Sequence, residues 1–206
     1  MTFFRYLLII TALSATPAFS QSVGLQLVDT TFKDPQDSMF GTFGVAIGDD
    51  ISFGGFRASY ALIDQLKIFA DIGLTHAELL DEEDAGMGIA GGFLIDLPFD
   101  KYCDTSLRAT YYRNAFMNEI DIDGYTAMIT TTWDIPGIEE AGFFGGLGIV
   151  EDNISVETDD SVVISGDAEF AYAVGISWVL NDNYTLYVEY DDADHSRWGI
   201  SIAKLY

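Results

Sequence analysis

Residues 173–206 read AVGISWVLNDNYTLYVEYDDADHSRWGISIAKLY and contain three stretches of alternating side chains separated by polar breaks. One face of the last stretch carries, in order, Trp198, Ile200, Ile202, Lys204 and Tyr206. Because successive side chains of a β-strand point to opposite faces, this period of two predicts strands. The Asp182-Asn183 pair predicts a tight turn between the first two stretches. The segment therefore predicts a hairpin followed by a strand that reaches the last residue.

The same alternation extends back to residue 39. Ten segments are separated by Gly, Asp, Asn and Pro, and they span 39–47, 52–62, 66–77, 85–97, 105–116, 122–133, 142–150, 167–180, 184–191 and 196–206. No stretch shows a helical period of any length. The sequence thus predicts one all-β, antiparallel domain of ten strands, or of eight if the first hairpin, 39–62, lies outside the sheet.

The two faces of these segments show which side is enclosed. In segment 85–97 one face is small, with Gly86, Gly88, Ala90 and Gly92, and the other is large and apolar, with Met87, Ile89, Phe93 and Ile95. A water-exposed face would favour long charged side chains, whereas small ones suit a narrow, packed lumen. Most segments are also close to the 9–11 residues with which a tilted strand crosses a bilayer. This pattern predicts a transmembrane β-barrel with its apolar face toward lipid.

Aromatic residues gather near the segment ends, as an interfacial girdle requires. They are Phe53, Tyr125, Trp133, Tyr184, Tyr190, Trp198 and Tyr206.

The first residues, MTFFRYLLIITALSATPAFS, have the layout of a secretory signal peptide. A single positive charge, Arg5, precedes an apolar run from Tyr6 to Ala12, and small residues stand at Ala18 and Ser20. The run is well short of the roughly 20 apolar residues that a membrane-spanning helix needs. We therefore expect a cleaved signal peptide over 1–20, a periplasmic lead-in over 21–38 and the barrel over 39–206.

Composition excludes some classes of function. The chain has 33 acidic and 9 basic residues and a formal net charge of −24, which argues against binding nucleic acid through a basic patch. Its one cysteine, Cys103, rules out an internal disulfide framework, and we interpret it as a turn residue.

With the hairpin around Asp182-Asn183 and the final strand ending on Tyr206, the sequence resembles the small outer-membrane β-barrel proteins of Gram-negative bacteria. This group includes the opacity-protein and outer membrane protein A-like barrels, and the resemblance covers about residues 39–206. It implies a porin-like barrel in the bacterial outer membrane, surrounded by outer-membrane lipids and lipopolysaccharide. It also implies that the assembly machinery reads the last strand through Trp198, Ile200, Ile202 and Tyr206. Lys204 departs from the family pattern, where an apolar or aromatic residue is usual, but it can snorkel to the interface.

Family barrels keep both termini in the periplasm, which implies the side of each connection. Short turns near 63–65, 98–104, 134–140 and 181–183 fall in the periplasm, and connections near 48–51, 78–84, 117–123, 151–166 and 191–196 face outward. The outward connections hold eighteen Asp and Glu residues and no Lys or Arg. Two interpretations stay open. The acids form a crown that attracts cations or helps to bind divalent ions between lipid head groups, or they are simply solvated.

Charged residues inside the strands point into the lumen by alternation. They are Arg57, Lys67, Asp71, Arg108, Glu169, Glu189 and Arg197. Buried without partners, each charge would cost several kcal/mol, so the set predicts ion pairs. These form either a plug that closes the barrel or the charged lining of a small pore, and we favour the plug because few side chains fill so narrow a lumen.

Neither histidine supports a catalytic function. His195 follows DDAD, and DEED stands at 81–84, an arrangement weakly similar to the acid and histidine pairs of outer-membrane proteases. However, Ala193 occupies the place of the acid in an Asp-x-His pair, and the predicted strands are shorter than those of such proteases. His195 and Ser196 are adjacent on a strand and so point to opposite faces, which argues against a lipid-modifying enzyme. We also interpret His76 as structural. The sequence predicts no enzyme, cofactor or metal site, but a structural or surface-interaction barrel or, alternatively, a small cation-favouring channel. An outer-membrane protease or lipid-modifying enzyme is the remote alternative.

Overall fold

The computed structural model describes residues 39–48, 51–79, 82–97, 103–117, 120–156, 162–193 and 195–205. The predicted signal peptide, the lead-in and Tyr206 lie outside these residues. Within the described ranges, no helix is long and apolar enough to cross a membrane.

The described residues form eleven β-strands. They are β1 (Met39–Gly48), β2 (Ile51–Ile63), β3 (Leu66–Leu79), β4 (Glu82–Leu97), β5 (Asp104–Phe116), β6 (Ile120–Ile135), β7 (Ile138–Val156), β8 (Val162–Ser165), β9 (Glu169–Asn181), β10 (Tyr184–Ala193) and β11 (His195–Leu205).

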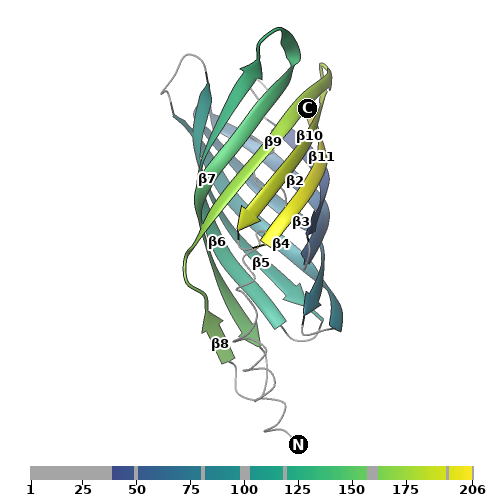
Figure 1. The fold of residues 1–206 in the computed structure, drawn as a ribbon, viewed down its shortest axis with the longest axis vertical. Helices are drawn as coiled ribbons and strands as arrows, with labels where there is room; N and C mark the ends of the chain where they lie inside the picture. The colour runs from purple at the N-terminus through teal and green to yellow at the C-terminus, as the bar shows by residue number, and fades with distance from the viewer. Residues whose placement is uncertain are drawn as a thin grey trace, which may run out of the picture.

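Ten of these strands close into an antiparallel barrel. From β1 to β7 each strand pairs with the next, β7 pairs with β9 (Figure 1), and β9 pairs with β10 and β10 with β11. The barrel closes where β1 pairs with β11, from Phe40↔Leu205 to Gly48↔Arg197. The short strand β8 pairs only with the end of β7 and lies beyond the barrel wall. The predicted ten-stranded, all-β fold is therefore confirmed, and the eight-stranded alternative is wrong because β1 and β2 belong to the closed sheet.

The register staggers the strands around the barrel. From Gly44 on β1, the successive register partners on β2, β3, β4, β5 and β6 lead to Ile154 on β7. In the opposite direction, the successive partners on β11, β10 and β9 lead to Gly142, which is also on β7. The offset between these two positions is twelve residues along one strand. A stagger of this size tilts the strands against the barrel axis, as their diagonal course in Figure 1 shows.

Several strands run further than the sequence predicted. β7 has 19 residues and β4 and β6 have 16 each, and the β6–β7 ladder continues to Ile120↔Val156. Inside this extension Phe116 and Ile122 pack with Ala77. The predicted connection over 151–166 is thus partly strand, because inter-strand hydrogen bonds and alternation continue past the apolar stretch that marks the membrane. The strands are therefore longer than predicted, and their length does not exclude a protease.

Because the strands are antiparallel, the last residues of β1, β3, β5, β7 and β10 lie at the same end of the barrel as the first residues of β2, β4, β6, β9 and β11. We call this end the acidic end, because the sequence between these strands is rich in Asp and Glu.

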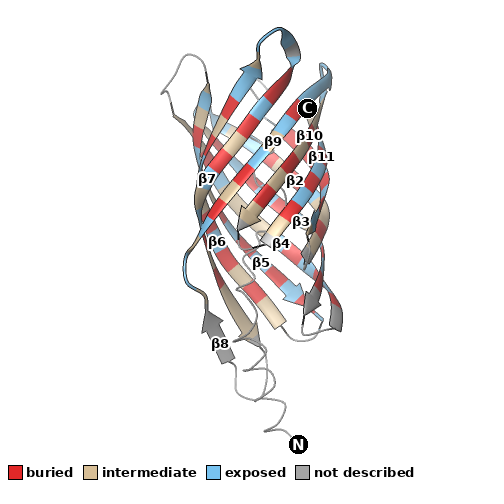
Figure 2. Ribbon diagram, viewed as in Figure 1, coloured by how far each residue is buried: buried red, intermediate tan, exposed pale blue. Residues whose placement is uncertain are grey.

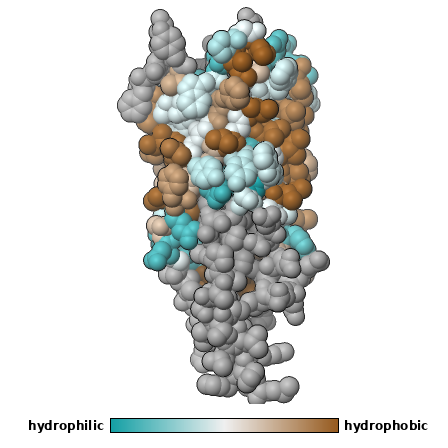
Figure 3. Space-filling view, viewed as in Figure 1, coloured by the Kyte–Doolittle hydropathy of each residue, from teal (hydrophilic) through white to brown (hydrophobic). Residues whose placement is uncertain are grey.

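Burial alternates along most of the strands that form the barrel (Figure 2). Large apolar side chains such as Phe43, Ile72 and Leu147 are exposed on the exterior, and apolar residues cover much of the visible wall in Figure 3. The buried side chains point inward and are small, polar or charged at many positions. A closed barrel that exposes an apolar wall is built to face lipid.

Glycines on the inner face of the barrel leave space for aromatic rings from the same or a neighbouring strand. A Cβ added at Gly73 would lie 2.4 Å from the Phe53 ring, and one at Gly175 would lie 2.4 Å from the Phe144 ring. Phe53 was predicted to belong to the interfacial girdle, and this is wrong: it is buried inside the barrel. It shares its face with Arg57, four residues further along the same strand, so alternation already places it inside.

Candidate functional site: the charged interior of the barrel

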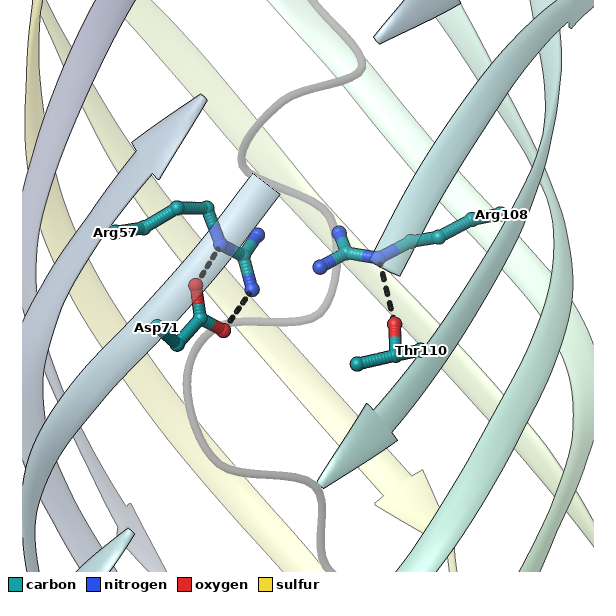
Figure 4. Close-up of polar contacts among 4 residues, drawn as sticks. All are labelled: Arg57, Asp71, Arg108 and Thr110. Carbon is teal, nitrogen blue, oxygen red and sulfur yellow. Dashed lines mark hydrogen bonds and ion pairs between the residues drawn. The ribbon is translucent and has the colours of Figure 1, made fainter. Parts of the chain in front are cut away.

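An arginine and an aspartate form a bidentate ion pair inside the barrel. Arg57 on β2 stands directly opposite Asp71 on β3. Its Nε donates to Asp71 Oδ1 at 2.6 Å and its Nη2 donates to Oδ2 at 2.7 Å (Figure 4). Both residues are 5 % exposed. This two-bond geometry fixes the guanidinium plane as well as neutralising the charge.

A second arginine shares an aromatic ring with this pair. The guanidinium carbons of Arg57 and Arg108 each lie 4.5 Å from the centroid of the Phe69 ring. The two guanidinium groups extend toward each other from separate strands (Figure 4), and Arg108 Nε donates to Thr110 Oγ1 at 3.4 Å. Cation–π contacts of this kind are strongest where water is excluded, and Arg108 is 1 % exposed. We call Arg57, Asp71, Phe69 and Arg108 the central cluster.

Two further cations pair with acids that the sequence prediction did not include. Arg197 on β11 faces Asp191 on β10, with Nη2 at 2.8 Å from Oδ1, and both residues are buried. Lys67 Nζ lies 3.6 Å from Asp96 Oδ2, and Ser106 Oγ donates to Oδ1 of the same carboxylate at 2.8 Å. Each of these pairs joins neighbouring or nearby strands, so each also ties the barrel wall together.

The structure thus divides the predicted lumen set into groups. Arg57, Asp71 and Arg108 come together through Phe69, whereas Lys67 and Arg197 contact Asp96 and Asp191. Glu189 is also buried, and Glu169 at the start of β9 is half-buried.

Some acids of the predicted outward connections lie inside the barrel instead. Asp84, Asp152 and Asp191 are buried. Asp191 follows Glu189 by two residues, so the alternation that places Glu189 in the lumen also places Asp191 there. The alternation was present in the sequence, but residues 191–196 were predicted to form an outward connection.

Apolar residues also occupy the lumen, in two clusters. One cluster contains Phe144, Tyr187 and Met128 with Ala46, Ala173 and Ala203, and the Phe144 and Tyr187 ring centroids are 6.0 Å apart. A second contains Phe53, Tyr112, Val150 and Ala171. The interior therefore holds apolar clusters as well as charged groups, and a surrounding of low polarity strengthens an ion pair.

The remaining candidates lie apart from this interior. His76 is exposed on β3, and the side chain of His195 lies outside the described part of the molecule. The Cys103 thiol is half-buried, with Sγ 3.9 Å from Thr105 Oγ1. Among the residues that the structure describes, no group of three His, Cys, Asp or Glu side chains is arranged to hold a metal ion.

The predicted assembly strand faces outward. Trp198, Ile200 and Ile202 are exposed on the barrel exterior, and Tyr206 lies outside the described residues. The Lys204 Nζ atom lies 5.9 Å from the centroid of the Tyr184 ring, at the end opposite the acidic end. This lysine thus has an aromatic partner at the position where the family pattern has an apolar side chain.

Known proteins are similar to this chain in structure alone, and only distantly. No protein-family model and no curated protein sequence matches the chain. Among solved structures, the KdgM porin is 9 % identical over 81 % of this chain and 99 % of its own, with a TM-score of 0.43. The outer membrane protease OmpT from Escherichia coli is 9 % identical over 82 % of this chain and 94 % of its own, with a TM-score of 0.44. Ail, the attachment invasion locus protein of Yersinia pestis, is 12 % identical over 82 % and 95 %, with a TM-score of 0.37. At such low scores these likenesses carry no argument about activity, and the assignment as a ten-stranded barrel of the outer-membrane type rests on the closed sheet and its apolar exterior.

Proposed function

We propose that this protein is an integral outer-membrane β-barrel whose lumen is closed by its own side chains, with a structural or surface-interaction role. The observation that carries the proposal is the central cluster. Two arginines from β2 and β5 meet at one phenyl ring, and one of them is held by a bidentate carboxylate.

Packing around the central cluster supports a closed lumen. Phe69 lies over Gly92, where an added Cβ would be 2.6 Å from its ring, so the ring spans from β3 toward β5. Phe53 and Phe144 cover glycines of neighbouring strands in the same way. A water-filled pore would keep its charged side chains hydrated, whereas Arg57, Lys67, Arg108 and Arg197 are all buried.

A small cation-favouring channel is the second candidate. It is favoured by the excess of acids at the acidic end, where Asp84, Asp152 and Asp191 point into the barrel. Negative charge at a narrow entrance raises the local cation concentration and disfavours anions. In this candidate the central cluster would be a selectivity constriction instead of a plug.

Conductance separates these two candidates. The processed protein, purified from membranes and inserted into planar bilayers under a salt gradient, is expected to be electrically silent. Reproducible conductance steps with a cation-selective reversal potential would support the channel. We assign no catalytic role, and an assay of peptide and phospholipid cleavage by the same preparation tests this part of the proposal.

A further inference from the structure

Three aromatic side chains form a row across the outside of β9, β10 and β11 near the acidic end. The ring centroids of Tyr172 and Tyr190 are 6.2 Å apart, and those of Tyr190 and Trp198 are 5.0 Å apart. Trp198 stands directly opposite Tyr190 in the register and is 63 % exposed. The row therefore offers a broad aromatic surface on the exterior of the barrel.

A carboxylate is held in a fixed position within this row. Tyr172 Oη donates to Asp192 Oδ2 at 3.3 Å, and Tyr190 Oη donates to the same oxygen at 3.2 Å. Asp192 pairs with Tyr172 in the register and stands one residue before the end of β10. Within the described residues, the other oxygen, Oδ1, makes no hydrogen bond, so it can accept one from a ligand. We call Tyr172, Tyr190, Asp192 and Trp198 the aromatic platform.

The platform lies at the edge of the apolar exterior. On the same face, Val174 on β9 and Ile200 on β11 are exposed two residues further into the barrel wall. Beyond the platform, β10 ends at Ala193. Tyr and Trp are suited to this boundary because their rings are apolar and their polar atoms reach water or head groups. A ligand here would have its polar part at the platform and could have acyl chains along the wall.

The chemistry of the platform limits the ligand class. Exposed rings bind flat apolar faces, and a carboxylate accepts strong hydrogen bonds from hydroxyl groups. A sugar ring has both features. Acidic sugars are disfavoured by Asp192 and by the net charge of −24. Tyr172, Tyr190 and Trp198 lie on three successive strands, and the planes of adjacent rings are tilted by 47° and 57°. An ammonium group is the other ligand that aromatic faces attract, and the experiment below includes it as a competitor.

We propose that the aromatic platform binds the neutral sugar head group of a glycolipid in the surrounding membrane. The sugar ring lies on Trp198 and Tyr190, and its hydroxyls donate to Asp192. The proposal rests on the proposed insertion in a membrane, but it is independent of whether the lumen conducts.

The fluorescence of Trp198 reports whether a ligand binds to the aromatic platform. The chain has three tryptophans, so a Trp133→Phe, Trp178→Phe variant keeps Trp198 alone. This variant is purified in a polyoxyethylene detergent, which carries no sugar, and its fluorescence is titrated with decyl maltoside below micelle-forming concentration and, separately, with free maltose. We expect a saturable change with decyl maltoside, and at least tenfold weaker binding of maltose because the alkyl chain contacts the wall. The variants Asp192→Asn and Tyr190→Leu should each weaken binding at least tenfold.

Matched controls separate the platform from a general effect of exterior aromatics. In the parent chain, Trp178→Leu removes an exposed tryptophan from the opposite end of β9 and should leave decyl maltoside binding unchanged, measured by equilibrium dialysis. Heat-dependent electrophoretic mobility shows that each variant is folded. The proposal is overturned if the fluorescence change does not saturate, or if Asp192→Asn binds like the parent. It is also overturned if maltose binds as tightly as decyl maltoside, which indicates a site for soluble sugar, or if choline chloride competes fully, which indicates a cation site. Silence or conductance in a bilayer has no bearing on these outcomes, so the two proposals fail separately.

Discussion

Arg57 and Asp71 face each other across β2 and β3 and are joined by two hydrogen bonds of 2.6 and 2.7 Å in the interior of the barrel. Removing one partner of such a buried pair leaves the other charge in a site of low polarity. Substitution of both by apolar residues removes the charges together and often costs little.

We therefore expect Asp71→Ala to lower the free energy of unfolding by about 3–5 kcal/mol. The double variant Arg57→Met, Asp71→Leu should recover most of this loss. Urea-induced unfolding in lipid vesicles, followed by tryptophan fluorescence, measures both. A double variant as unstable as Asp71→Ala would show that the pair does not act as a unit.

Phe69 should matter both for stability and for closure of the lumen. Its ring contacts two guanidinium groups and covers Gly92, so Phe69→Ala is expected to cost about 3–5 kcal/mol, the usual range for a buried phenylalanine. The same variant should pass ions where the parent does not. Phe93→Ala, on the exposed face of the neighbouring strand, is the control and should remain silent. Equal behaviour of the two variants in unfolding and conductance would contradict the assignment of Phe69 as a closing residue.

The interior glycines should be intolerant of even one methyl group. At Gly73 an added Cβ would lie 2.4 Å from the Phe53 ring and 2.6 Å from the Gly54 carbonyl oxygen, whereas at Gly54, on the outer face, the nearest atom would be 3.5 Å away. We expect Gly73→Ala to destabilise the barrel by about 1–3 kcal/mol. Gly54→Ala should change stability by less than about 0.5 kcal/mol. Thermal unfolding of the two variants side by side checks this, and equal melting temperatures would show that Phe53 does not occupy the space above Gly73.

The two histidines should be dispensable. His76 is exposed on the outside of β3, away from the central cluster. We expect the parent protein to cleave neither a fluorogenic peptide library nor phospholipid vesicles, and His76→Ala and His195→Ala to fold as the parent does. A cleavage activity that disappears in His195→Ala would overturn the non-enzymatic assignment.

Much of the fold could be predicted because successive side chains of a barrel strand point alternately to the outside and to the lumen. The two environments differ in polarity, so the sequence alternates with a period of two. Small residues opposite large apolar ones, as in β4, showed which face is enclosed. Strand ends were predicted less well. Above the apolar belt, β7 continues with polar residues such as Glu151 and Asn153, whose alternation is preserved although the hydrophobic contrast is lost.

The interior was only partly predictable for a related reason. Alternation assigns a side chain to the lumen, but it does not give its partner, since partners depend on the register between strands. Asp191 was therefore missed as the partner of Arg197. Phe69 was missed because an apolar residue among charged ones gave no signal until the stagger brought β2, β3 and β5 around one ring.

The central claim is that the lumen is closed by the central cluster, and single-channel recording of the processed protein tests it most directly. In planar bilayers under a salt gradient, we predict no conductance steps from the parent, although heat-modifiable electrophoretic mobility shows that it is folded. We predict that steps appear when Phe69 and Arg108 are both replaced by alanine. Steady conductance steps from the parent, with a reversal potential that indicates cation preference, would contradict the account and identify the protein as a channel.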